Sequence, residues 1–178
     1  MSKRHISEFS GSAKDEWDTP LKPVLELLPY LDPEELISEP CAGGGALARH
    51  LHSNGFAVAE MYDIRPRATG IEIGDATQRT PEYLSVTNPP YTRAPLLKLL
   101  SASAEWAKPS WWLLPWDVTC NLYFAEFSSR VSAMIPVGRV SWLGNGSGGM
   151  ENFGWIKLEP NPVADPALKR RQKRGDTQ

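Results

Sequence analysis

Several residue types are scarce in this sequence, and each shortage narrows what the chain can be. The 178 residues include two cysteines, Cys41 and Cys120, which excludes a disulfide scaffold. Neither cysteine has a His or Cys nearby at zinc-ligand spacing, so we expect no metal site. The longest apolar run, at 111–116, is far shorter than a membrane span, and the first residues contain no apolar signal-peptide core. We therefore expect a soluble, cytoplasmic protein with no membrane partner.

Charge of either sign is also in no great excess. The formal net charge is −2 and 41% of the residues are hydrophobic, a composition that suits one compact domain. The charge is unevenly spread, because the run KRRQKR at 169–174 carries five positive charges in six positions. We predict a flexible N-terminal segment at residues 1–16, one domain at 17–160 and a disordered basic tail at 161–178.

The sequence does contain a regular alternation of short apolar runs and helical patterns. Apolar residues recur at helical spacing after Pro20, and further helices are predicted at 46–54, at 94–107 and near 121–129. The runs that predict strands are 36–38, 56–62, 71–73, 83–87, 111–115, 131–136 and 152–158. This alternation predicts an α/β sandwich with a mainly parallel central sheet.

Polar residues follow four of the predicted strands, at the edge where open α/β sheets bind their ligands. The four endings are Glu39-Pro40-Cys41-Ala42-Gly43-Gly44-Gly45, Asp63, Asp75 and Asn88-Pro89-Pro90-Tyr91. Glycines at 43 and 45 let the backbone approach a ligand closely, and an acidic residue about twenty positions later is suited to hold a ribose diol. Because residues 43–48 also fit the pattern G-x-G-x-x-A, this spacing alone leaves a dinucleotide such as NAD open.

Taken together, these motifs resemble those of the class I S-adenosylmethionine-dependent methyltransferases, and among them the enzymes that methylate adenine N6 or cytosine N4 in DNA. The stretch 39–45 looks like the acidic-Pro-x-x-Gly-x-Gly cofactor loop of that family, and 87–91 looks like its Asn-Pro-Pro-Tyr catalytic motif. The resemblance covers roughly residues 17–158. It implies a Rossmann-like fold, S-adenosyl-L-methionine as cofactor and DNA as the substrate.

The resemblance also assigns roles to individual residues. Asp63 would bind the ribose hydroxyls of the cofactor, Asp75 its adenine amine, and the segment Asp18-Thr19-Pro20 its methionine end. The catalytic residues that it implies are Asn88, Pro89, Pro90 and Tyr91. The cofactor-binding residues that it implies are Thr19, Pro20, Glu39, Pro40, Ala42, Gly43, Gly45, Asp63, Asp75 and Asn88.

The chemistry of a nucleobase amine explains why such a motif is useful. The lone pair of the amine is delocalised into the ring, so an enzyme has to hold both N–H bonds and favour a more pyramidal nitrogen. Asn88 Oδ1 and the Pro89 carbonyl can accept those two hydrogen bonds, and the successive prolines hold the carbonyl rigidly. Tyr91 offers a flat face on which a base extruded from a duplex can stack.

Other functions share these residues. Cytosine N4, adenine in RNA and a glutamine side-chain amide all present a planar NH₂, and a non-enzymatic protein of the same fold could bind cofactor or nucleic acid. The pair Pro40-Cys41 also resembles the nucleophile of cytosine C5 methyltransferases, but it lies in the cofactor loop, so we interpret Cys41 as structural. The chain has no room for a separate target-recognition domain, which a partner chain or a homodimer could supply.

On the substrate side, Trp116 is a candidate for lining the base pocket. The glycine-rich loop at 144–149 is either a substrate lid or a long hairpin connection. Candidate phosphate contacts, besides the basic tail, are Arg65, Arg67, Arg93, Lys98 and Arg139.

Overall fold

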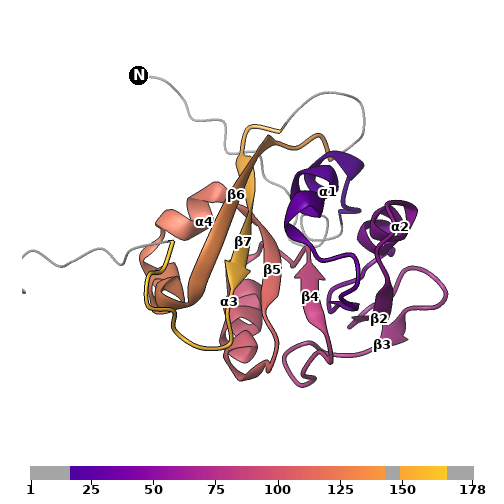
Figure 1. Ribbon diagram of the computed structural model, residues 1–178, viewed down its shortest axis with the longest axis horizontal. Coiled ribbons are helices and arrows are strands. Elements are labelled where there is room, and N and C mark those ends of the chain that lie inside the picture. Colours follow the sequence, from indigo (N-terminus) through magenta and orange to yellow (C-terminus); the bar gives the residue numbers. More distant parts are fainter. Residues whose placement is uncertain (1–16, 143–148, 168–178) are drawn as a thin grey trace, which may run out of the picture.

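The computed structural model describes residues 17–142 and 149–167, and these residues form helices on both faces of one seven-stranded sheet (Figure 1). The strands are β1 (Ile37–Glu39), β2 (Val58–Asp63), β3 (Glu72–Ile73), β4 (Leu84–Thr87), β5 (Ser110–Pro115), β6 (Val131–Arg139) and β7 (Asn152–Leu158). The α-helices are α1 (Leu21–Leu27), α2 (Ala46–Ser53), α3 (Arg93–Ala102) and α4 (Trp116–Cys120). Short 3₁₀ turns are η1 (Leu28–Tyr30), η2 (Ser103–Glu105), η3 (Leu122–Glu126) and η4 (Ser128–Arg130).

The strand order is β3-β2-β1-β4-β5-β7-β6, so the first strand of the chain lies inside the sheet. The five strands from β3 to β5 pair in parallel, and β7 pairs antiparallel with both β5 and β6. All residues of β1, β4 and β5 are buried, as expected for parallel strands that are covered on both faces. The prediction of an α/β sandwich with a mainly parallel sheet is confirmed.

The two faces of the sheet carry separate hydrophobic cores. On one face, Val24 and Leu27 of α1 and Leu47 and Leu51 of α2 pack against the strands. On the other face, α3, α4 and η3 bury a cluster in which the rings of Trp106 and Trp112 stack. Because the strands from β3 to β5 pair in parallel, their carboxyl ends lie along one edge of the sheet, and the polar residues that follow these strands lie there too.

The predicted helix near 121–129 is replaced by shorter pieces. α4 begins directly after Pro115 and ends at Cys120, because Asn121 is extended with ψ 144°. The chain then continues through the 3₁₀ turns η3 and η4 to the first residue of β6.

The end of the domain differs slightly from the predicted boundary. The backbone N–H groups of Val163 and Ala167 donate hydrogen bonds of 2.9 and 2.8 Å to the carbonyls of Ser129 and Val131. The chain is therefore attached to the domain at least as far as residue 167. The predicted flexible segment 1–16 and the basic run at 169–174 lie outside the described residues.

Residues 17–142 and 149–167 lack two features. In that part of the chain, no helix combines the length and apolar character that crossing a membrane requires. The same residues contain no group of three or more His, Cys, Asp or Glu side chains placed to hold a metal ion.

Candidate cofactor and substrate site

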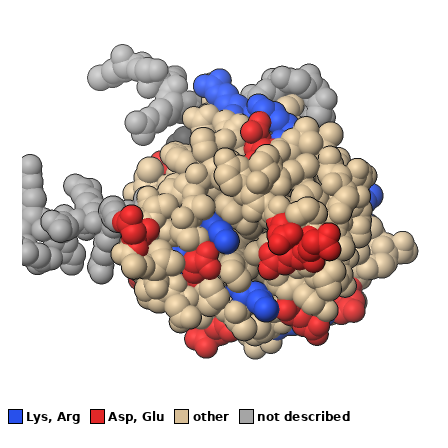
Figure 2. All heavy atoms as spheres, viewed as in Figure 1, with Lys and Arg blue, Asp and Glu red and all other residues tan. Residues whose placement is uncertain are grey.

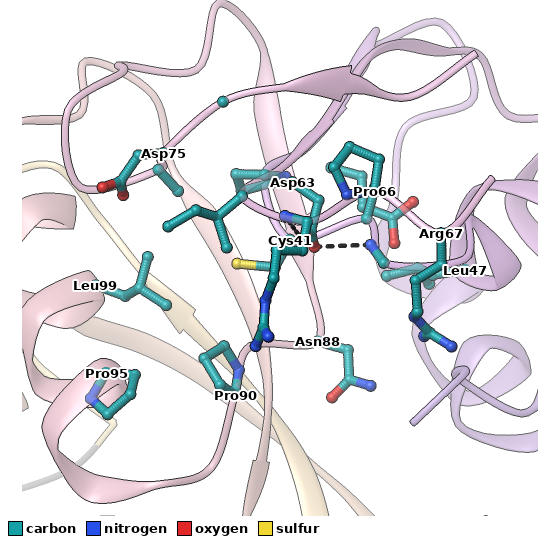
Figure 3. A pocket seen from close by; sticks show the side chains of 18 of the residues that line it. Cys41, Leu47, Asp63, Pro66, Arg67, Asp75, Asn88, Pro90, Pro95 and Leu99 are labelled. Carbon is teal, nitrogen blue, oxygen red and sulfur yellow. Dashed lines mark hydrogen bonds between the residues drawn. The ribbon is translucent and has the colours of Figure 1, made fainter. Parts of the chain in front are cut away.

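A cavity of about 800 Å³ lies where the four predicted polar endings meet. It is lined by residues that follow β1, β2, β3 and β4, by the start of α2 and by one side of α3. Asp63 and Asp75 lie along one side of this cavity, and Asn88 and Pro90 lie along the other (Figure 3). Its volume is within the range of about 300–1,000 Å³ that is usual for small-molecule sites.

The glycine loop turns sharply between β1 and α2. Gly43 and Gly45 have positive φ angles of 51° and 72°, a conformation that glycine adopts without steric cost. Gly45 is the N-cap residue of α2, and its N–H donates to the carbonyl of Ala42. These two positions explain why the loop contains glycine, and Gly43 itself lines the cavity.

The carboxylate of Asp63 connects the glycine loop with the loop that follows β2. Its Oδ2 accepts a 2.8 Å hydrogen bond from the Gly43 N–H, and its Oδ1 accepts a 2.7 Å hydrogen bond from the Arg65 N–H. A carboxylate has about four acceptor positions, so both oxygens can still accept from a diol in the cavity.

Glu39 lines the cavity but is only 2% exposed. Its Oε2 accepts a 3.0 Å hydrogen bond from the Ala48 N–H, which ties the end of β1 to the first turns of α2. Burial raises the pKa of Glu39 well above its usual value, and the nearby charge of Asp63 adds to this effect. The buried side chain thus stabilises the conformation of the glycine loop between β1 and α2.

Asp75 lies on a turn that follows β3. Its Oδ1 accepts 2.8 Å hydrogen bonds from both the backbone N–H and the hydroxyl of Thr77, which fixes the carboxyl group at the cavity. The backbone of Arg79 donates to the Asp75 carbonyl, and the Arg79 guanidinium pairs with Glu60 at 2.6 Å and with Glu72 at 2.7 Å. The turn is therefore anchored to β2 and β3.

Asn88 is held at both ends of its side-chain amide. Its Nδ2 donates to Thr19 Oγ1 at 3.1 Å and to the Trp17 carbonyl at 3.5 Å. Its Oδ1 accepts a hydrogen bond from the hydroxyl of Tyr91. Asn88, Thr19 and Trp17 all line the cavity.

The ring of Tyr91 is placed differently from the stacking role predicted for it. Its centroid lies 5.4 Å from that of Phe153 and 6.0 Å from that of Trp142, so the ring packs against the C-terminal hairpin. Pro89 is buried, and the members of this motif that line the cavity are Asn88 and Pro90. Among the other predicted residues, Thr19, Pro40 and Ala42 line it, whereas Pro20 and Gly45 do not.

An ion pair beside the glycine loop was not predicted from the sequence. Asp18 Oδ1 and Arg67 Nη2 are 2.9 Å apart, and the Arg67 backbone N–H donates to the Gly43 carbonyl at 2.9 Å. A Cβ atom at Gly44 would lie 2.6 Å from the Asp18 carboxylate. The apolar lining contributed by Leu47 was also missed, and no local motif marks either feature.

Cys41 and Trp116 differ in their position relative to the cavity. Cys41 lines the cavity, and burial raises its pKa to about 12, so the thiol stays protonated at neutral pH. Trp116 does not line the cavity. Its ring packs against Gly154, and a Cβ atom added to Gly154 would lie only 2.4 Å from Cζ3 of Trp116. The predicted place of Trp116 in the base pocket is not supported, and most of the loop at 144–149 lies outside the described residues.

The cations near the site are dispersed. Arg65, Arg67 and Lys98 line the cavity, whereas the Arg93 guanidinium lies 5.0 Å from the centre of the Tyr123 ring. Arg139 is the last residue of β6, opposite Asn152. On the face drawn in Figure 2, Lys and Arg side chains form separate spots among acidic groups.

Comparisons with known proteins give a match in structure and none in sequence. No protein-family model matches the chain, and no curated protein matches it. A Pyrococcus horikoshii protein provisionally described as an RNA methyltransferase superposes with a TM-score of 0.60 at 12% identity, covering 80% of this chain and 85% of that one. The 23S rRNA methyltransferase ErmE gives 0.55 at 15% identity over 84% and 69% of the two chains.

A third similar structure belongs to a much larger protein. The type IIG restriction endonuclease BpuSI gives a TM-score of 0.59 at 15% identity, covering 85% of this chain and 26% of that one. These matches show that the chain has the Rossmann-like fold of the class I S-adenosylmethionine-dependent methyltransferases.

Proposed function

We propose that this protein is an S-adenosylmethionine-dependent methyltransferase that modifies the N6 amine of adenine in DNA. One observation carries the proposal: Asn88 and Pro90 border the same cavity as Asp63 and Asp75, on its opposite side. A cofactor held by the two carboxylates would present its far end to the Asn-Pro-Pro-Tyr motif.

The residues around the cavity fit this cofactor. Asp63 and Asp75 offer free acceptor positions for hydroxyl and amine groups, and Ile64 and Leu99 add apolar side chains to the lining. Thr19 lies at the other end of the cavity, beside Asn88. The lining thus combines an apolar body with a few polar groups in separate places, as an adenosine with a charged tail requires.

The side chain of Asn88 supplies the chemistry that a nucleobase amine needs. Its Oδ1 has two acceptor positions, and the Tyr91 hydroxyl occupies one of them. The second can accept an N–H of the target amine, and we propose the carbonyl of Pro89, which joins the two lining residues Asn88 and Pro90, as the acceptor of the other. Bound at Asp63 and Asp75, S-adenosylmethionine would supply an electrophilic methyl group to the amine nitrogen and would be left as a neutral thioether, and the amine would lose one proton to solvent.

Adenine in RNA is the second candidate substrate. Among the similar structures are a dimethyladenosine transferase from Plasmodium falciparum and the 23S rRNA methyltransferase ErmE, whereas BpuSI is a restriction endonuclease. A glutamine amide is a further possibility for the same motif, since one similar structure is an Mtq2–Trm112 complex that methylates a translation termination factor. We favour DNA because the motif most resembles that of DNA amino-methyltransferases.

The test is to identify the methylated product. The purified protein is incubated with labelled cofactor and, separately, with duplex DNA, single-stranded DNA, RNA and a protein extract, and the products are hydrolysed and examined by mass spectrometry. We expect the product N6-methyl-2′-deoxyadenosine, from the DNA samples. N4-methylcytosine, or transfer to RNA or protein alone, would contradict the proposed substrate.

The matched control for this experiment is Asn88→Ala. Loss of a preorganised polar contact at a reacting group typically costs about 10²–10³ in rate, so the variant should be nearly inactive while it still binds cofactor. A wild-type protein that binds cofactor but transfers methyl groups to none of the pools would instead indicate a non-enzymatic binding protein.

A further inference from the structure

We propose that Thr19 is a positioning residue whose hydroxyl holds the Asn88 side-chain amide in place, in the orientation that the Trp17 carbonyl selects. This inference rests on the proposed function for the role of Asn88. Thr19 is only 4% exposed and its Oγ1 lies 3.1 Å from Asn88 Nδ2. The resemblance to known enzymes assigns Thr19 to the methionine end of the cofactor, whereas the geometry gives it a second partner on the catalytic motif.

The orientation follows from which atoms can donate. The two ends of an asparagine amide are similar in shape, so their partners decide which end is the oxygen. A backbone carbonyl can only accept, and the Trp17 carbonyl lies 3.5 Å from the same end of Asn88 that faces Thr19. That end is therefore the NH₂ group, and Oδ1 faces the Tyr91 hydroxyl.

This orientation decides whether Asn88 can work on an amine. A flipped amide would direct its own N–H groups at the N–H groups of the substrate, and two donors cannot form a hydrogen bond. Of the two contacts on the NH₂ side, the one to Thr19 is shorter by distance, 3.1 against 3.5 Å. The Trp17 carbonyl decides which end of the amide is the NH₂ group, and the Thr19 hydroxyl makes the shorter hydrogen bond that holds this end in place.

The same short segment is also attached to the cofactor loop. Asp18, the neighbour of Thr19, pairs with Arg67 at 2.9 Å, and the Arg67 backbone donates to the Gly43 carbonyl. Residues 17–19 therefore join the glycine loop to Asn88, which lies 69 positions further along the chain than Thr19. A change at Thr19 should act on catalysis through Asn88 and leave the Asp18–Arg67 pair in place.

Two substitutions separate this role from direct cofactor binding. Thr19→Val keeps the shape and removes the hydroxyl, and Thr19→Ser keeps the hydroxyl. The first measurement needs no activity: in protein labelled with ¹⁵N-asparagine, the side-chain NH₂ signals of Asn88 are identified by their loss in Asn88→Asp. We expect Thr19→Val to shift these signals and speed their exchange with solvent, while Thr19→Ser leaves them close to wild type.

The second measurement compares kcat with cofactor affinity. Loss of one net hydrogen bond predicts a fall in kcat of about tenfold for Thr19→Val, recovered in Thr19→Ser, with the Kd for cofactor by calorimetry changed less than about twofold. Unchanged Asn88 signals in Thr19→Val, or a raised cofactor Kd with unchanged kcat, would overturn the inference. If wild-type protein transfers no methyl group, the proposed function fails, and the NMR result still decides whether Thr19 orients Asn88.

Discussion

The two sides of the cavity are built in different ways. On the side of β1, β2 and β3, the carboxylates of Asp63 and Asp75 accept hydrogen bonds from backbone N–H groups within their own or the adjoining loop. On the side of β4, Asn88 is held by the Thr19 hydroxyl and the Trp17 carbonyl from a distant segment, and by the Tyr91 hydroxyl from its own motif. The first arrangement is largely local and the second depends on distant parts of the chain.

This difference indicates how each side tolerates substitution. A carboxylate that organises backbone N–H groups determines the path of its loop, so its loss changes both the loop and the ligand contacts that the loop makes. An amide held by side chains can be reoriented by one substitution while the backbone around it stays in place. We therefore expect changes near Asp63 to affect binding and changes near Asn88 to affect the rate.

The largest effect is expected for Asp63→Ala, which should weaken ligand binding on the carboxylate side of the cavity. The substitution leaves the N–H groups of Gly43 and Arg65 without their 2.8 and 2.7 Å acceptors and removes the proposed ribose contact. Hydrogen bonds to a charged group contribute about 1.5–3 kcal/mol each, so the Kd for S-adenosylhomocysteine should rise about a hundredfold or more in calorimetry. A rise below about threefold would show that the loop keeps its shape without this carboxylate.

The next effect concerns stability away from the cavity, where β7 packs against α4. A Cβ atom at Gly154 would lie 2.4 Å from the Trp116 ring and 3.0 Å from the Ile135 carbonyl, so Gly154→Ala should lower the free energy of unfolding by about 1–3 kcal/mol. Gly149→Ala is the matched control, because its Cβ atom would have an ordinary contact of 3.5 Å to the Val140 carbonyl. Equal denaturation midpoints for the two variants would contradict the packing described for Trp116.

A smaller, pH-dependent effect is expected for Glu39→Gln. Burial raises the pKa of Glu39 above its usual 4.5, so the folded protein binds this proton more tightly than the unfolded chain. The wild type should therefore lose stability relative to the variant as the pH rises from about 4.5 through the folded pKa. Thermal unfolding of both proteins between pH 4 and 8 measures how their stability difference changes with pH. If the wild type became more stable relative to Glu39→Gln as the pH rises, a raised pKa of Glu39 would be excluded.

The smallest effect is expected for Tyr91→Phe. The ring contacts with Phe153 and Trp142 remain, and only the hydroxyl that donates to Asn88 is lost. Because this change frees an acceptor position on Oδ1, kcat should stay within about tenfold of wild type, the scale of one hydrogen bond. Tyr91→Ala, which removes the packing as well, should lose far more activity in the same assay, and equal activity of the two variants would show that the ring has no role.

The sequence predicted the local features of the site well. Strand endings, glycine positions and the spacing to Asp63 are short-range signals, because a parallel sheet brings the carboxyl ends of its strands to one edge. The cavity contains Glu39, Gly43, Asp63, Asp75 and Asn88, as these signals indicated.

The long-range contacts could not be predicted in the same way. Nothing in the neighbourhood of Asn88 shows that its NH₂ group meets Thr19, or that Tyr91 packs against the C-terminal hairpin. The Asp18–Arg67 pair joins residues 49 positions apart, and it likewise depends on how the loops close after the sheet has formed. The same limit applies to Trp116, whose ring is turned toward Gly154 of a strand far along the chain.

The central claim is that Asn88 makes an amine reactive toward a cofactor held on the opposite side of the cavity. The most direct test is a single-turnover reaction in which protein loaded with methyl-labelled cofactor is mixed with adenine-containing DNA, for wild type and for Asn88→Ala. With both proteins loaded to the same measured extent, the account predicts transfer by the wild type alone. Transfer by Asn88→Ala at the wild-type rate would contradict it.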